Sequence, residues 1–222
     1  MIKSLLVIQQ GLPYMLQGAV VNVIVVLSAM LFGFMLGLPL AVGQVYGNRF
    51  LRRIIGIYVW FFRGIPLLVF LFLFYFGLFT WLDINVSAFM VATMVLGLIS
   101  SAYQSQILRG AISSLSQGQM KAARALGMSD TKAIVFIILP QAFRLSIPGW
   151  TNEYAILLKD SAVTYALGVT ELMSRAHHIA SRTYEHLAIY LAAGFIFLIF
   201  TYIGTKALNI LHKKVTIPGC SQ

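Results

Sequence analysis

A small group of polar residues interrupts an otherwise apolar stretch in the second half of the chain. Its members are Asn152, Glu153, Lys159 and Asp160. Glu153 and Asp160 are seven positions apart, so on a helix they share one face to within about 20°. Ionisable groups at membrane depth are costly and usually face a cavity or a partner. Because two carboxylates on one face would attract a cation, we predict a cation-binding site here, with Asn152 adding an adjacent polar group.

An internal ion pair is the alternative for part of this group. Lys159 could neutralise Asp160, or a carboxylate on a paired subunit, and Asn152 could form a hydrogen bond across helices. Both interpretations remain open for Lys159 and Asp160. Glu153 has no such neighbour in the sequence, and a helix running from Arg144 would place it about 14 Å further along, near mid-membrane. We therefore expect Glu153 to determine specificity.

The composition excludes an ordinary soluble domain. Of the 222 residues, 59% are hydrophobic and 10% are charged, whereas a soluble domain is about a quarter charged. A bilayer is the solvent that suits such a chain, with about 20 apolar residues per helical span. The net charge of +10 then fits a basic cytoplasmic side better than nucleic-acid binding. One cysteine, Cys220, excludes a disulfide within the chain, and we expect no cleavable signal sequence in the first eleven residues.

Apolar periodicity predicts an all-α membrane protein with five transmembrane helices. We expect residues 1–13 at an interface and no internal repeat, so residues 1–222 form one domain. The second block is split by Arg63-Gly-Ile-Pro66, because proline disfavours helix immediately before it. In the first span, Ser28 and the glycines at 33, 37 and 43 would let another helix approach closely. The predicted spans are 14–46, 66–82 after a short helix over 54–62, 86–111, 146–166 and 186–210, with a connection over 168–185.

The orientation follows from the positions of lysine and arginine. One side of the five-span plan would hold eleven of these residues and the other three, namely Lys3, Arg175 and Arg182, with Arg63 and Lys159 unplaced. The basic side of a membrane protein faces the cytoplasm. We therefore predict an outside N-terminus and a cytoplasmic C-terminus. The eleven are Arg49, Arg52, Arg53, Arg109, Lys121, Arg124, Lys132, Arg144, Lys206, Lys213 and Lys214.

Residues 117–144 form a charged, compact stretch between two apolar spans, and on this plan they are cytoplasmic. Ser116 and Gln119 are spaced as a capping box, which predicts a short helix over 120–126 with Gly127 at its left-handed C-terminal position. A second helix would run from Asp130 to Pro140. Alanine at 122 and 123 gives the first helix a low profile, so we predict that it docks in a groove of another protein.

A series of motifs occurs in order through residues 60–172. Within the charged stretch they are Ala122-Ala123, Gly127 and Ile138-Leu-Pro140. The other segments are Arg63-Gly-Ile-Pro66, Gln119, Leu139-Pro-Gln-Ala-Phe-Arg144, Pro148, Asn152, Leu158-Lys-Asp-Ser161 and Gly168-Val-Thr-Glu-Leu172. Together they resemble the polar amino-acid group of permease subunits of ABC importers, and the charged stretch resembles the EAA loop of that family. Lys121 stands where the family loop has its glutamate, so the detailed contact with the ATPase would differ.

The resemblance implies a division of labour. The fold would be that of a type I importer permease with a cytoplasmic coupling helix, in a bacterial inner membrane. Two permeases would pair, each docked on an ATP-binding subunit, and an extracytoplasmic binding protein would deliver the amino acid. This chain has no phosphate-binding loop, so we expect it not to be an enzyme, and ATP and Mg²⁺ would belong to the partner. The expected docking residues are Gln119, Lys121, Ala122, Ala123, Arg124 and Gly127.

The cation site then suggests a cargo, namely a basic amino acid such as arginine, lysine or histidine. The expected substrate-binding residues are Glu153, Asp160, Asn152, Lys159, Ser161 and Arg63. Counted back from Asp83, Arg63 would lie near the inner end of the second span. There it could anchor the helix, line the inner mouth or meet a substrate carboxylate, and we favour a structural or gating role.

Two other classes of function fit the sequence less well. A proton-coupled secondary transporter would use Glu153 or Asp160 as its proton carrier, but five spans without an internal repeat argue against it. A membrane enzyme would need a nucleophile and base or a metal cluster, and none is visible. His177 and His178 have no third ligand nearby, so we interpret them as residues of the outer loop.

Overall fold

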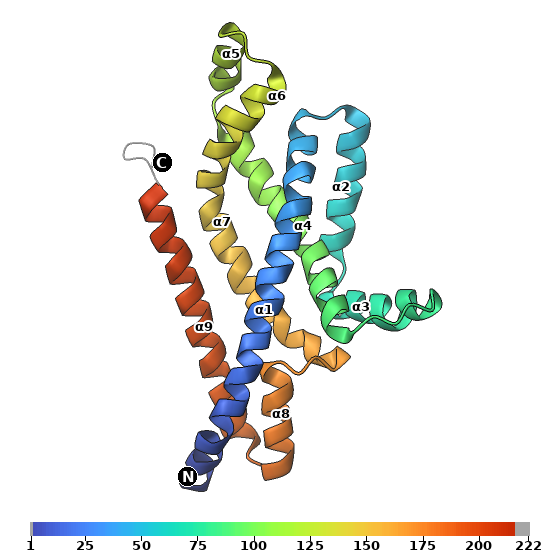
Figure 1. Ribbon diagram of the computed structural model, residues 1–222, viewed down its shortest axis with the longest axis vertical. Coiled ribbons are helices and arrows are strands. Elements are labelled where there is room, and N and C mark those ends of the chain that lie inside the picture. The colour runs from blue at the N-terminus through green and yellow to red at the C-terminus, as the bar shows by residue number, and fades with distance from the viewer. Residues whose placement is uncertain (1, 216–222) are drawn as a thin grey trace.

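A computed structural model describes residues 2–215, with side chains from residue 4, and this part of the chain is helical apart from short connections. Figure 1 shows an elongated molecule with α5 and α6 at one end and the N-terminus and α8 at the other. In chain order the elements are α1 Ile2–Tyr46, α2 Arg49–Gly64, α3 Leu67–Phe72, the π-helical η1 Leu73–Phe79, α4 Ala88–Ser114, α5 Gln117–Ala125, α6 Asp130–Ala133, the π-helical η2 Ile134–Ile138, α7 Leu139–Asp160, the 3₁₀ helix η3 Ser161–Leu167, α8 Leu172–Thr183 and α9 His186–Val215.

Four helical stretches in the described residues are long and apolar enough to cross a membrane: Ser4–Tyr46, Ala88–Ser114, Asp130–Leu167 and His186–Val215. A fifth is present if Arg49–Gly64 and Leu67–Phe79 count as one broken span, with a bend of 102° between them. The break at Pro66 is where the sequence predicted it. The predicted straight span over 66–82 is wrong, because after the bend the chain turns across the other helices instead of running along them (Figure 1).

The first and fourth spans are longer than predicted. Helix α1 continues through Pro13 to Ile2, because its N-terminal turns pack on α8. A methyl group added at Gly11 would lie 2.8 Å from the Ile179 side chain. The fourth span does not stop at Leu139-Pro140 either, since α7 begins there directly after the π-helical turn η2. Pro140 has no N–H to donate, and it lies in the first turn of α7, where that donor is not needed.

Helix α8 lies within residues 168–185, where the sequence predicts only a connection. Glu171 begins it, since its carboxylate accepts hydrogen bonds from the N–H groups of Met173 and Ser174. Leu172, Ala176 and Ala180 follow at intervals of four and are buried. They pack with Met15 of α1 and Ile189 of α9, so α8 closes the end of the bundle at which the N-terminus lies (Figure 1).

Small residues set the contact between α1 and α4 at the centre of the molecule. A methyl group added at Gly33 would lie 2.8 Å from the amide nitrogen of Gln104 and 2.9 Å from the Ser100 hydroxyl. At Gly37 it would lie 3.0 Å from the Ser101 carbonyl oxygen. The predicted close approach at these glycines is confirmed. It brings the backbone of α1 within reach of the polar side chains of α4.

Candidate functional site

A cavity of about 400 Å³ lies where the broken span meets α4 and α7. Arg63 and Asp160 both line it, together with Tyr103 and Ile156. The guanidinium of Arg63 is 4.7 Å from the centre of the Tyr103 ring, which holds it by a cation–π contact. Cavity walls that carry one cation and one anion can bind a zwitterion, with its carboxylate at Arg63 and its ammonium at Asp160.

The count of residues from which the depth of Arg63 was predicted does not hold. Arg63 lies in the last turn of α2, fourteen residues after Arg49, so it is about 21 Å along that helix from its start. The prediction counted distance back from Asp83 along a straight span. Because the chain bends by 102° at Pro66, that distance does not measure depth. Arg63 is exposed at the end of α2, where it lines the same cavity as Asp160 of α7.

Glu153 lies next to this cavity but does not line it. Its side chain is 3% exposed, and the Ser100 hydroxyl donates to the carboxylate at 2.8 Å. The Gln104 amide in turn donates to Ser100 at 3.0 Å and to the carbonyl oxygen of Met30 at 2.9 Å. This chain of hydrogen bonds fixes Glu153 between α7, α4 and α1. Arg63 and Asp160 remain its electrostatic neighbours.

The other residues predicted around the carboxylates take different positions. Asn152 and Lys159 are exposed on α7, and Lys159 forms no salt bridge with Asp160 within the described residues. Ser161 is fully buried and does not face the cavity. Its hydroxyl donates to the Leu158 carbonyl oxygen at 2.7 Å and accepts from the Asn22 amide at 2.8 Å.

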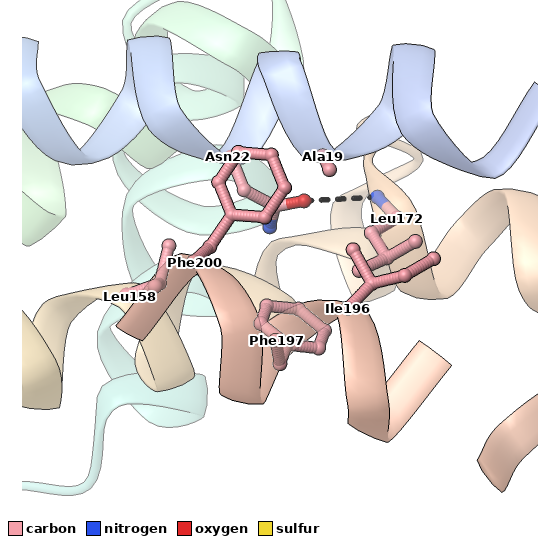
Figure 2. Close-up of a pocket in the computed structure, with 7 residues that line it drawn as sticks. All are labelled: Ala19, Asn22, Leu158, Leu172, Ile196, Phe197 and Phe200. Carbon is pink, nitrogen blue, oxygen red and sulfur yellow. Dashed lines mark hydrogen bonds between the residues drawn. The ribbon is translucent and has the colours of Figure 1, made fainter. Parts of the chain in front are cut away.

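Asn22 belongs to a buried polar cluster that sequence reasoning missed. Its amide nitrogen also donates to Glu171 at 2.9 Å, and its oxygen accepts from the Leu172 N–H at 3.0 Å. Figure 2 shows this last bond beside a crevice lined by Leu158, Phe197 and Phe200, which is too small for a water molecule. Burial raises the pKa of the Glu171 carboxyl above its ordinary value, and the hydrogen bonds that it accepts oppose the rise. The cluster joins α1, η3 and α8. A lone asparagine in an apolar span was the signal for it.

The first part of the predicted docking stretch, residues 116–127 with α5, forms an exposed hook at the end of the molecule far from the N-terminus (Figure 1). Ser116 begins α5 as predicted, but it accepts from the N–H of Gly118 at 3.2 Å, and no side-chain bond from Gln119 completes a capping box among the described contacts. Gly127 ends the hook with φ at 77°, in the predicted left-handed conformation. Leu126 is 82% exposed, so the tip offers an apolar contact to another protein.

Charge and burial divide the residues of α5 into two groups. Ala123 is buried, whereas Gln119, Lys121 and Ala122 face outward. Arg124 donates to the Asp130 carboxylate at 2.8 and 2.9 Å, and this partner raises the pKa of the guanidinium. Lys121 has no such partner in the described part of the chain. Of the two cations of α5, Lys121 is therefore the one without a carboxylate partner among the described residues, while Arg124 stabilises the turn into α6.

A family model described as "Binding-protein-dependent transport system inner membrane component" matches residues 29–217. Among curated proteins, the arginine transport system permease protein ArtQ of Bacillus subtilis is 34% identical over 197 residues, covering 87% of this chain and 90% of that protein. The L-cystine transport system permease protein TcyB of the same organism is 32% identical over 211 residues, covering 95% and 90%.

Among solved structures, one described as an amino acid ABC transporter with histidines matches with a TM-score of 0.85. It is 30% identical and covers 94% of this chain and 97% of that chain.

Proposed function

The chain belongs to the family of binding-protein-dependent transport system inner membrane components, and from that premise we propose that it forms half of the membrane path of an ATP-driven importer of cationic amino acids. Its place as the permease of an amino-acid importer follows from the family and from its relatives. The family's description implies a binding protein as a partner. ATP hydrolysis lies on a separate subunit, which docks on α5.

The observation that carries the substrate proposal is the cavity shared by Arg63 and Asp160. An amino acid placed there would put its carboxylate on Arg63 and its ammonium on Asp160. Glu153 lies behind this site with its electrostatic neighbours Arg63 and Asp160. The negative charge of Glu153 would attract a positive side chain on the substrate, so Glu153 supplies the preference for arginine, lysine or histidine. The relatives' names include both arginine and L-cystine, so the preference rests on this carboxylate.

The transport cycle that we propose couples the hook to this cavity. Closure of two ATP-bound subunits would move α5. After the turn over 126–129, α6, η2 and α7 form one helical run to Asp160 that would carry this movement. Two copies of this chain, or this chain and a homologue, would then expose the cavity to the outside. The basic end with Lys121, Lys132 and Lys213 would face the cytoplasm, and the N-terminus would lie outside the inner membrane.

Glu153→Gln tests the charge preference with little change of shape, because the amide oxygen can still accept from Ser100. We expect the KM for arginine to rise about tenfold, because the variant loses about 1.4 kcal/mol of attraction between Glu153 and the substrate side chain. The affinity of the transporter for glutamine should not change. The measurement is uptake in proteoliposomes with the ATPase and binding protein present. Asp83→Asn, which removes an exposed carboxylate from an outer turn, is the control. An unchanged KM for arginine would remove Glu153 from the substrate site.

A further inference from the structure

One face of α9 changes from apolar to polar along its length. Its members recur at intervals of three and four residues, so they lie in one stripe along the helix. The apolar part is well exposed, with Phe195 at 64% and Leu198 at 63%. Tyr202, at 61%, stands at the transition. The stripe consists of Phe195, Leu198, Tyr202, Lys206, Asn209 and Lys213.

The polar end of the stripe surrounds a shallow cavity of about 300 Å³. Lys206 and Lys213 lie about 10.5 Å apart along the helix axis, with Asn209 between them. The Lys206 ammonium is 5.4 Å from the centre of the Tyr202 ring. Helix α9 contains no aspartate or glutamate, and neither lysine forms a salt bridge with a carboxylate of the described residues. Two cations and an amide therefore converge on a space that no anion of the described chain fills.

The stripe lies on the flank away from the Arg63 and Asp160 cavity. Helix α9 packs on α1, α7 and α8, whereas that cavity is bounded by the α2–α3 junction, α4 and α7. Under the proposed function, on which this step rests, two permeases face each other across the cavity. The opposite flank then faces lipid, and its lysine end lies at the cytoplasmic leaflet.

We propose that this stripe binds one anionic phospholipid of the cytoplasmic leaflet. The phosphate lies between Lys206 and Lys213, with the Asn209 amide donating to it, and the acyl chains run along Leu198 and Phe195. Lys206 reaches the headgroup level by extending its apolar stem along the helix, as lysines near helix ends do. Tyrosine suits the boundary between headgroup and hydrocarbon, and basic side chains on the cytoplasmic side attract anionic headgroups.

Native mass spectrometry of the assembled complex tests this site. The complex is delipidated in detergent, incubated with equal amounts of phosphatidylglycerol and phosphatidylcholine, and the retained lipid is counted. For the double variant Lys206→Gln, Lys213→Gln we expect phosphatidylglycerol retention to fall about tenfold, with phosphatidylcholine unchanged. Lys214→Gln is the matched control, because it removes the same charge at the same helix end about 100° away from the stripe, and it should retain the lipid. Thermal unfolding in phosphatidylcholine alone checks that the double variant folds.

Two results would overturn the proposal. One is equal phosphatidylglycerol retention by the unmodified chain and the double variant. The other is a double variant with fewer permease copies per complex, which would assign the stripe to contact with another copy of the chain. Lipid retention is measured without substrate or ATP, and amino-acid uptake is measured separately, so failure of the lipid site and failure of the transport role are distinguishable.

Discussion

Asp160→Asn is expected to lower uptake of every transported amino acid, by about 30-fold to 100-fold at substrate concentrations below KM. Asp160 lines the cavity opposite Arg63, and the substrate ammonium would lose its charged partner there. Removing one member of a buried, hydrogen-bonded charge pair costs about 2–5 kcal/mol, which is consistent with such a loss. Because every amino acid carries the ammonium group, arginine and glutamine should both be affected, unlike in Glu153→Gln.

The control for Asp160→Asn is the residue beside it. Lys159 is charged, lies on the same helix and is exposed outside the cavity, so Lys159→Gln should leave uptake within about twofold of normal. Assembly with the ATPase is checked by copurification. Equal uptake by Asp160→Asn and the unmodified chain would show that the cavity is not the substrate site. A comparable loss in Lys159→Gln would assign both residues to structure.

Gly127→Trp is expected to abolish ATP-driven transport, with at least about a 20-fold loss, while the permease still inserts and pairs. Gly127 has φ at 77°, a conformation that costs other residues about 1–2 kcal/mol. No neighbouring atom lies within 4 Å of an added methyl group, so a tryptophan would project from the tip of the hook. It would occupy the space where the ATPase docks, and nucleotide closure would no longer move α7.

The ratio of ATP hydrolysed to substrate transported measures this loss. Gly194→Trp is a suitable comparison, because Gly194 also has no atom within 4 Å of an added methyl group and lies in α9, away from the hook. It should insert and transport. If Gly127→Trp kept a normal ratio of hydrolysis to transport, the hook would not be the docking element.

The parts of the fold that the sequence predicted are those set by local rules. Each long span needs about 20 apolar residues, so the sequence predicted that the span exists even where it did not predict the residues at which the span begins and ends. Proline disfavours helix in the residue before it, which located the break at Pro66, although α1 continues through Pro13 and Pro39. A glycine after a short helix marked the left-handed residue at Gly127. In these cases the residue itself, rather than a distant contact, determines the conformation.

The parts that were missed depend on contacts between distant residues. Helix α8 exists because Met15 and Ile189 cover its buried face, and its N-terminal cap is joined to Asn22, 149 positions away from Glu171. The depth of Arg63 depends on a bend of 102°, and proline specifies a break but not its angle. The two carboxylates of α7 could be predicted because charge in an apolar run is a local signal. The sequence did not predict that Asp160 would line the cavity while Glu153 would lie in a buried hydrogen-bond network.

Reconstitution of transport tests the central claim most directly. The permease is placed in proteoliposomes either alone or with its ATPase subunit, binding protein and internal ATP, and arginine uptake is followed with and without a pH gradient. We predict uptake only with the ATPase and hydrolysable ATP, and no response to the gradient. Uptake by the permease alone, driven by the pH gradient, would contradict the proposal that a separate ATPase drives this chain.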